Sequence, residues 1–397
     1  MKKFIFYEAV NNQMKETDKY YCFEQGPIRP PSEAQSLLLR VSRNCPWNRC
    51  TFCPVYKGTR FSVRPVEHVK KDIDSVYRYI EILKNMAEKS DYISRTDIVK
   101  IAKKTDPDEL RPAVAAFKWF SEGMKSVFIQ DANSLIIKPA DLIDILNHLK
   151  MRFPRIERIT SYARSHTIAR IKDDDLKAMK HAGLNRIHIG LESGSDQVLK
   201  MVKKGVTKKT HIKAGLKVKK ASMELSEYVM PGLGGIDLSD VHAIETADAL
   251  NRINPHFIRL RSLAIPDSIP LFQDYIDGCF KKCTEIMMVK EILMFIENID
   301  GLTSAVKSDH ILNLFEDLEG TLPQDKEHMT NIPKDFLAMP PEKQCLYQIG
   351  RRLGIFSGLG DMENSGLAAK AEDACIQIGI NPGNVDQIID EIMKRFV

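Results

Sequence analysis

Three cysteines, Cys45, Cys50 and Cys53, lie within ten residues of a chain that has only eight cysteines among its 397 residues. Their spacing is C-x4-C-x2-C, in the stretch "NCPWNRCTFCPVYKG". Thiolates are metal ligands, so three of them at this spacing can wrap one side of a metal centre. No fourth ligand follows at short range, because the next histidine is His68 and the next cysteine is Cys279.

A site with three thiolates fits two kinds of metal centre. A structural zinc site takes four protein ligands, so Cys22 or a C-terminal cysteine would have to complete it from a distance. A 4Fe-4S cluster held by three cysteines leaves one iron open for an exogenous ligand, which is a catalytic arrangement. The spacing favours the iron-sulfur cluster, with zinc and three unrelated loop thiols as the alternatives.

Six short runs rich in β-branched or aromatic residues predict six strands, and amphipathic stretches between them predict helices. From the second strand onward the strand starts are 30, 30, 38 and 33 residues apart, the length of one βα unit. We therefore expect an α/β fold with a parallel sheet, specifically a partial (β/α)6 TIM-like barrel whose chemistry lies at the carboxyl ends of the strands. The expected strands are 36–42, 126–132, 156–163, 186–192, 224–230 and 257–263.

The strand pattern divides the chain into three parts. Residues 1–34 form an extended lead-in, residues 35–265 form the partial barrel, and residues 266–397 form a helical C-terminal extension. The gap between the first two strands is long enough for a helical insertion at about 90–125. The three cysteines follow the first strand, which places them at the end of the barrel where active sites form.

Composition excludes several classes of protein. Hydrophobic residues make up 43% and charged residues 28% of the chain, which are ordinary values for a globular protein. Neither the N-terminus nor the longest apolar stretch, 285–300, reads as a signal peptide or a membrane span, so we expect a cytoplasmic protein without a membrane partner. The net charge of +5 and the lysine-rich stretch 198–222 are compatible with a nucleic-acid partner. They do not indicate one, because a lysine-rich helix face exposed to solvent explains the same pattern.

The cysteine loop, Phe52 directly before the last cysteine, and "GLESGSDQVLKMVKKGVT" (190–207) together resemble the radical S-adenosylmethionine superfamily. The branch most similar contains anaerobic coproporphyrinogen oxidases, methylthiotransferases and elongator-type enzymes. The resemblance covers about residues 36–263 and implies a 4Fe-4S cluster on the three cysteines, with S-adenosylmethionine on the open iron. It further implies that S-adenosylmethionine is cleaved reductively to methionine and a 5'-deoxyadenosyl radical, which abstracts hydrogen from an unidentified substrate. A reductant such as flavodoxin or ferredoxin is implied as the source of the electron.

The resemblance also assigns roles to residues at other strand ends. Glu192 in "GLESG" matches the position that binds the ribose hydroxyls, although a place in the first turn of a helix is the simpler alternative. Lys204 matches the basic residue that pairs with the methionine carboxylate. Arg164, after the third strand, corresponds to an arginine of the cobalamin-type relatives, with a solvated surface charge as its alternative.

Two features depart from the family pattern. The family spacing is C-x3-C-x2-C, so this chain has one extra residue between Cys45 and Cys50. At the end of the second strand "FIQDANS" replaces the glycine-rich segment that receives the amino group of S-adenosylmethionine. Gln130, Asp131 and the backbone carbonyls of this segment are the candidates for that role, with an ordinary polar strand end as the alternative. Gly232, in "MPGLGG" after the fifth strand, is expected to let the backbone approach the cofactor.

The remaining candidates are less specific. Arg259 and Arg261 alternate along the last strand and therefore share one face, where they can bind an anionic substrate or pair with carboxylates outside. A non-catalytic zinc or iron-sulfur protein that binds RNA or a protein partner is the alternative function. A second iron-sulfur cluster is an alternative use of four C-terminal cysteines, Cys279, Cys283, Cys345 and Cys375. The first two are expected to share one face of a helix.

Overall fold

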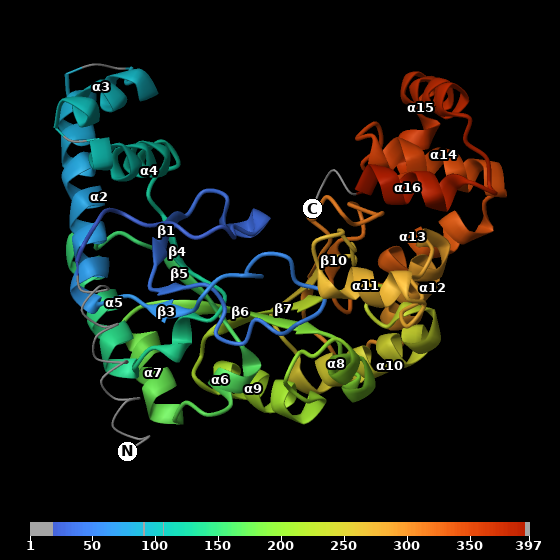
Figure 1. Ribbon diagram of the computed structural model, residues 1–397, viewed down its shortest axis with the longest axis horizontal. Helices are drawn as coiled ribbons and strands as arrows, with labels where there is room; N and C mark the ends of the chain where they lie inside the picture. Colours follow the sequence, from blue (N-terminus) through green and yellow to red (C-terminus); the bar gives the residue numbers. More distant parts are fainter. Residues whose placement is uncertain (1–18, 90–91, 106, 394–397) are drawn as a thin grey trace.

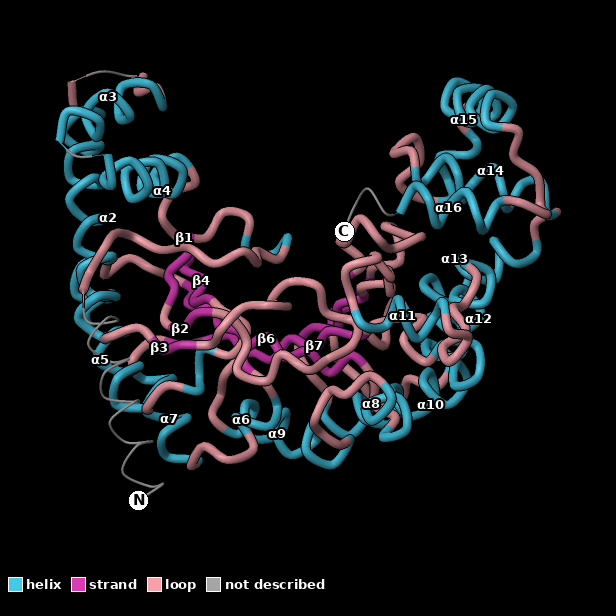
Figure 2. Tube along the Cα trace, viewed as in Figure 1, coloured by secondary structure: helices cyan, strands magenta, loops and turns pink. Residues whose placement is uncertain are grey.

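An eight-stranded, mostly parallel sheet forms the centre of the protein, with helices on its outer side (Figures 1 and 2). The computed structural model describes residues 19–89, 92–105 and 107–393, so the first 18 residues of the expected lead-in lie outside the described residues. All six expected strands are present and pair in parallel in chain order. They are β1 (Leu37–Arg40), β4 (Ser126–Gln130), β5 (Arg158–Ala163), β6 (Leu184–Glu192), β7 (Glu224–Val229) and β8 (Phe257–Leu260).

The sheet continues past residue 265, where the sequence predicts only helices. Strand β9 (Ala305–Lys307) pairs in parallel with β8, and β10 (Gly320–Thr321) pairs antiparallel with β9. These strands have three and two residues, which is too short for a hydrophobic alternation to appear in the sequence. A separate two-stranded ribbon of β2 (Ser42–Arg43) and β3 (Ser62–Val63) closes the base of the cysteine loop.

The helices that follow the strands carry one apolar face each. In α5 (Pro139–Arg152), Pro139 starts the helix, and the buried Leu142, Ile145, Leu146 and Leu149 recur at the helical period. The other helices that connect strands are α2 (Val66–Ala87), α3 (Arg95–Thr105), α4 (Leu110–Ser121), α6 (Ser165–Ile168), α7 (Asp173–His181), α8 (Asp196–Met201), α9 (Lys208–Lys220), α10 (Gly235–Ile253), α11 (Pro270–Ile276) and α12 (Glu285–Glu297). The C-terminal helices are α13 (Lys326–Ala338), α14 (Pro341–Arg352), α15 (Ser365–Ile378) and α16 (Val385–Met393).

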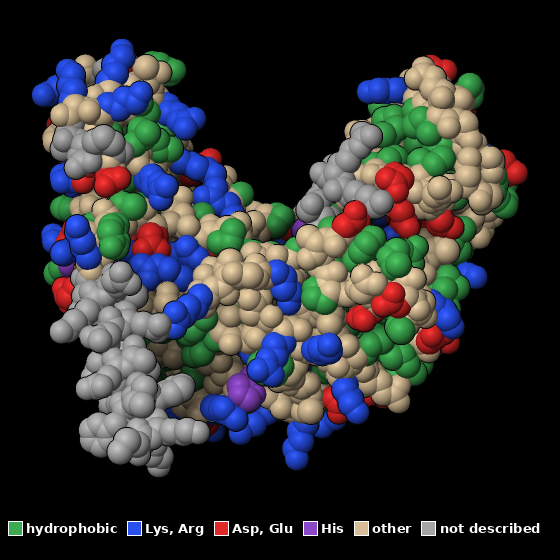
Figure 3. All heavy atoms as spheres, in the orientation of Figure 1, with side chains coloured by type: hydrophobic (Ala, Val, Ile, Leu, Met, Phe, Trp, Pro, Cys, Tyr) green, Lys and Arg blue, Asp and Glu red, His purple; other side chains and the backbone are tan. Residues whose placement is uncertain are grey.

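Two helical arms rise on either side of the sheet. Helices α3 and α4 occupy the expected insertion and form one arm with α2, whereas α13 to α16 form the other (Figure 1). The space-filling view shows a deep notch between the arms (Figure 3). No helix among the described residues is both long and apolar enough to cross a membrane.

The described part of the lead-in runs from the strand carboxyl ends, where Gly26 and Ile28 bond Gln130, toward the opposite end of the barrel. A short 3-10 helix, Pro31–Glu33, places the Glu33 carboxylate in the interior, where it is fully buried. Glu33 accepts a hydrogen bond from Ser36 before β1, lies 3.4 Å from Arg158 at the start of β5, and lies 3.5 Å from His188 on β6. One acidic side chain thus links the segment before β1, the start of β5 and the middle of β6.

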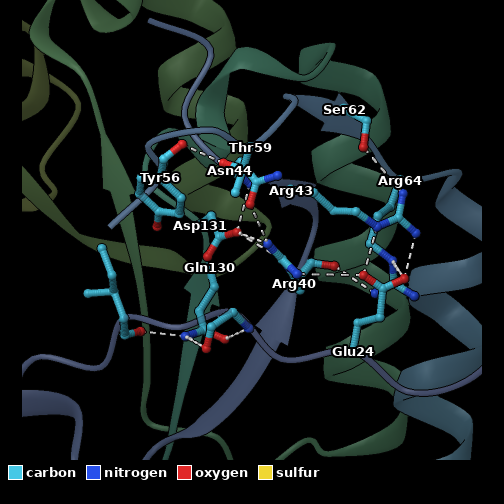
Figure 4. Close-up of polar contacts among 12 residues, drawn as sticks. Glu24, Arg40, Arg43, Asn44, Tyr56, Thr59, Ser62, Arg64, Gln130 and Asp131 are labelled. Atoms are coloured by element: carbon cyan, nitrogen blue, oxygen red, sulfur yellow. Dashed lines mark hydrogen bonds and ion pairs between the residues drawn. The ribbon is translucent and has the colours of Figure 1, made fainter. Parts of the chain in front are cut away.

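A cluster of charges fixes the lead-in to the first strand and to α2 (Figure 4). Glu24 receives two hydrogen bonds from Arg43, at 2.7 and 2.5 Å, and lies 3.4 Å from Arg64. The Arg64 guanidinium is 2.5 Å from the Asp72 carboxylate, and both side chains are almost completely buried. Burial raises the pKa of Asp72, and Arg64 opposes that shift.

We predict that Asp72→Ala lowers the free energy of unfolding by about 3 kcal/mol, because it leaves the Arg64 guanidinium buried without its partner. Urea denaturation followed by circular dichroism measures this loss. Glu81→Ala is the control, because Glu81 and Lys84 form an exposed pair, which contributes less than about 1 kcal/mol. Equal losses in the two variants would contradict the stabilising role of the buried pair.

Candidate functional site

A cavity of about 180 Å³ lies where the carboxyl ends of the central strands meet the cysteine loop. Its lining joins segments that are more than 200 residues apart in the chain, from Ile28 to Arg261. Eight of the residues expected from the sequence line this one cavity: Cys45, Cys50, Phe52, Cys53, Arg164, Glu192, Lys204 and Arg261. The expected convergence at the strand ends is therefore present for most of the candidate residues.

The cysteine loop accommodates its extra residue with two asparagines. Asn44 and Asn48 adopt left-handed backbone conformations, with φ of 67° and 44°, and asparagine tolerates this region better than most residues. At Asn48 the turn points the backbone N–H at the Cys45 sulfur, 3.5 Å away. Lys57 closes the far side of the loop by donating to the carbonyl of Cys50 at 2.8 Å. The longer spacing thus forms a turn whose N–H bonds to a cysteine sulfur.

Trp47 anchors the loop to the segment after α8. Its indole N–H donates to the carbonyl of Lys203 at 2.8 Å, and the Arg164 guanidinium lies 5.0 Å from its ring. The ring also packs against Gly205, where an added Cβ would be 2.2 Å from the indole. A backbone hydrogen bond from Thr51 to Val202 strengthens the same contact. The loop therefore has a defined position before any cofactor binds.

An ion pair between Lys204 and Glu192 lies at the centre of the lining. The Lys204 ammonium donates to Glu192 Oε1 at 2.8 Å, and it lies 5.5 Å from the Phe52 ring. Burial lowers the pKa of Lys204, but the charges of Glu192 and Cys50 outweigh it and the net shift is upward, so the ammonium is charged at neutral pH. Gly190 leaves room for the pair, since a Cβ there would be 2.2 Å from Glu192 Oε1.

Two cations lie beside the cysteines. Burial raises the pKa of the Cys50 thiol, and the charges of Lys204 and Arg164 oppose this rise. Burial likewise lowers the pKa of Arg164, whereas Cys45 and Cys50 oppose that shift. Arg164 also donates to the carbonyl of Lys204 at 2.7 Å. Negative charge on the sulfurs is thus stabilised from one side of the cavity.

Gly232 lies away from the cavity, contrary to the expectation from the sequence. Its φ of 85° suits glycine, but its N–H donates to Glu291 on α12 at 2.7 Å, and an added Cβ would meet Met288. Met230, two residues earlier, lines the cavity instead. A buried His242 holds this turn by bonding the Met230 carbonyl and the Ser193 hydroxyl, so the turn and the end of β6 are joined.

The side chains of Gln130 and Asp131 also point elsewhere (Figure 4). Gln130 bonds the backbone of Gly26 and Ile28 in the lead-in. The Asp131 carboxylate accepts from the Arg40 guanidinium at 2.8 Å and from the backbone N–H of Asn44 at 2.9 Å. The side chains of Gln130 and Asp131 therefore hold the lead-in and the cysteine loop in place. Ala132 is the residue of this segment that lines the cavity.

Several cavity residues were missed by the sequence analysis. Tyr162 and Tyr228 are the next-to-last residues of β5 and β7, and Met230 directly follows β7. Tyr56 and Ile28 come from loops. The period-2 alternation could have indicated Tyr162 and Tyr228, because they share a strand face with residues that end at the cavity. Nothing in the sequence indicates that the loop and lead-in residues approach it.

None of the other cysteines lines this cavity. Cys345 and Cys375 pack together in the C-terminal helices, whereas Cys279 is exposed. Cys279 and Cys283 lie in the loop between α11 and α12, not in the helix that the sequence suggested, because the chain between Ile276 and Glu285 is non-helical. Within 19–89, 92–105 and 107–393, no three acidic, histidine or cysteine side chains are placed to hold a single metal ion.

The donor set fits an iron-sulfur cluster better than a lone ion. Three partly buried thiols from one loop line a cavity with two cations beside them, and no fourth protein ligand joins them among the described residues. A cluster takes one thiolate per iron, so its ligands need not converge on a single point. Phe52 and Pro54 in the lining add the apolar shielding that such a centre requires.

A family model described as "Radical SAM superfamily" matches residues 39–247, more than half of the chain. The chain therefore belongs to the radical SAM superfamily and is an enzyme whose cofactors are a 4Fe-4S cluster and S-adenosylmethionine. The fold, a partial TIM-like barrel with a helical C-terminal part, agrees with this assignment.

Solved structures of the superfamily resemble the chain only distantly. Elp3 of the archaeon Methanocaldococcus infernus is 15% identical, with a TM-score of 0.40 over 49% of this chain and 52% of that one. Coproporphyrinogen III oxidase HemN of Escherichia coli is 14% identical, with a TM-score of 0.43 over 71% and 54%. The methyltransferase TsrM of Kitasatospora setae is 13% identical, with a TM-score of 0.47 over 90% and 66%. The chain thus spans about half the length of the first two, and no curated protein sequence matches it significantly.

We predict that Gly205→Ala loosens the cysteine loop, because its φ of +73° disfavours alanine and the new Cβ would displace Trp47. A left-handed alanine costs about 1–2 kcal/mol, so amide hydrogen exchange in residues 44–58 should accelerate roughly tenfold, as measured by mass spectrometry. Gly360→Ala is the control, since a Cβ there meets nothing within 4 Å. Unchanged exchange in the Gly205 variant would show that Trp47 does not anchor the loop.

Proposed function

We propose that this enzyme binds its 4Fe-4S cluster through Cys45, Cys50 and Cys53 and uses S-adenosylmethionine to abstract a hydrogen atom from an organic substrate. The observation that carries the proposal is that one cavity is lined both by the three thiols and by the Glu192–Lys204 pair. When bound, the two cofactors supply one-electron cleavage of the sulfonium, with an electron from an external reductant such as flavodoxin or ferredoxin.

The residues around the thiols support the binding of a reducible centre. Arg164 and Lys204 lie close enough to affect the charge state of Cys50, so they stabilise the thiolate form that binds iron. The backbone N–H of Asn48 at the Cys45 sulfur adds a hydrogen bond of the kind that tunes the reduction potential. Both effects come from this chain and do not depend on the substrate.

The ion pair offers complementary groups for S-adenosylmethionine. Lys204 occupies one oxygen of the Glu192 carboxylate, and the other oxygen can accept from ribose hydroxyls. Lys204 has further N–H groups for the methionine carboxylate. Gln130 and Asp131 already have protein partners, so we assign the amino group to the backbone of the segment at Ala132 instead.

We predict that the anaerobically reconstituted protein absorbs broadly in the visible and releases 5'-deoxyadenosine when it is given dithionite and S-adenosylmethionine. Cys45→Ala, Cys50→Ala and Cys53→Ala should each abolish both signals, because each removes a ligand of the cluster. Liquid chromatography with mass spectrometry quantifies the deoxyadenosine.

Cys279→Ala is the matched control for these variants, because Cys279 is an exposed cysteine outside the cavity. It should keep the absorption and the deoxyadenosine release of the unaltered protein. Cleavage that survives in any of the three loop variants would refute the ligand assignment.

We predict that Lys204→Met weakens S-adenosylmethionine binding by at least about tenfold, because the cofactor carboxylate loses a charged partner in a buried site. Equilibrium dialysis of the reconstituted, unreduced protein measures the affinity without cleavage. Lys200→Met serves as the control, since Lys200 lies exposed on the short helix α8, just before the segment that carries Lys204. If both variants bind equally well, Lys204 does not contact the cofactor.

A further inference from the structure

The end of the cavity away from the cysteines has aromatic walls. Tyr162 on β5 and Tyr228 on β7 have ring centroids 6.3 Å apart, and both rings lie 5.6 Å from His188 on β6. Phe128 on β4 packs edge-on against Tyr162 at 5.0 Å. Four adjacent strands thus contribute one aromatic side chain each to a continuous inner surface.

Arg259 in β8 and Arg261, directly after this strand, lie two positions apart at its end, and they have different partners in the structure. Arg259 lies 2.5 Å from Asp309, the residue two positions after β9, so its charge is already balanced. Arg261 lines the cavity and forms no ion pair and no side-chain hydrogen bond with any described residue. The sequence could not distinguish them, because Asp309 reaches Arg259 only through β9.

Tyr162 and His310 lie close enough to Arg261 to feel its charge. The hydroxyl of Tyr228 is buried beside the Tyr162 hydroxyl, its hydrogen-bond neighbour, whereas the buried hydroxyl of Tyr56 lies nearer to Asp131 and the cysteines. Burial raises the pKa of Tyr56 and Tyr228, so both hydroxyls keep their protons at neutral pH. The pKa of His310 is lowered to about 4 by burial and then by the charge of Arg261, so this histidine is neutral.

The carboxylates on this side of the barrel already have partners other than Arg261. Asp309 pairs with Arg259, and Glu33 lies 3.4 Å from Arg158. Among the described residues that line the cavity, Glu192 is the acidic one, and it pairs with Lys204. The Arg261 guanidinium carries five N–H donors and no acceptor. A partly buried cation that lines a cavity and has no partner among the described residues is complementary to an oxyanion.

We propose that the substrate is a small organic oxyanion with an apolar or aromatic body, held by Arg261. The guanidinium binds the carboxylate or phosphate through two N–H groups. The body lies against Tyr162 and Met230, between Arg261 and the cysteine end of the cavity. This assignment rests on the proposed function, since it names the substrate class for the same site.

Three naphthalene compounds with the same ring and different head groups test the assignment. They are 1-naphthylacetate, 1-naphthyl phosphate and the neutral 2-(1-naphthyl)ethanol. Equilibrium dialysis uses the full-length protein, as purified and after reconstitution, without reductant, so no step of catalysis is needed. We expect at least one anion to bind about tenfold or more tightly than the alcohol. The tighter of the two anions then identifies the head group.

Arg261→Gln should remove this preference and bring the anion to the affinity of the alcohol. Arg261→Lys should retain part of it, because lysine keeps the charge but loses the planar fork. Arg155→Gln, which removes an exposed arginine outside the cavity, should behave like the unaltered protein.

Equal binding of anion and alcohol, no measurable anion binding at millimolar concentration, or a preference that survives in Arg261→Gln would each overturn the substrate assignment. None of these results affects deoxyadenosine release, so a failure here is distinguishable from a failure of the proposed function.

Discussion

The ion pair between Lys204 and Glu192 is the interaction on which the rest of the site depends. It joins the carboxyl end of β6 to the segment after α8, which in turn supports the cysteine loop through Trp47. The pair forms only because Glu192 accepts a left-handed backbone, with φ of 63°, and because Gly190 carries no side chain. Arg164 remains as a surplus positive charge beside the thiols, which suits a site that must hold several thiolates in a confined space.

The scaffold around this pair is built mainly from buried charge, not from apolar packing alone. Glu33 links the segment before β1 to β5 and β6, and the Glu24 and Asp72 carboxylates hold the lead-in against Arg40, Arg43 and Arg64. The side chains of Gln130 and Asp131 continue this network up to the cysteine loop. Because such groups are costly when unpaired, each fixes the register of the segments it connects. The lead-in is therefore a structural part of the barrel, and its Ile28 reaches the cavity lining.

The sequence predicted those features that repeat or cluster locally. Six strands and their helices were found from periodicity, and the three cysteines, Glu192 and Lys204 were found from motifs at strand ends. Strands β9 and β10 were not found, because three and two residues carry no alternation. The roles of Gln130, Asp131 and Gly232 depend on partners more than 50 residues away, such as Gly26, Arg40 and Glu291. Long-range pairing of this kind leaves no local signature, and it also decides which of Arg259 and Arg261 is free.

The placement of Trp47 gives the protein a built-in optical reporter. The chain has two tryptophans, and the second, Trp119, is buried on α4, where its indole bonds the carbonyl of Ser126 at the beginning of β4. Trp119 thus lies at the amino end of β4, in an apolar setting, whereas the cysteine loop follows the carboxyl end of the neighbouring β1. Trp47 packs against Gly205 and stacks with Arg164 beside the thiols. Its fluorescence can be separated from that of Trp119 by replacing either indole with phenylalanine. Energy transfer from Trp47 to a coloured centre would then follow cofactor loading in real time.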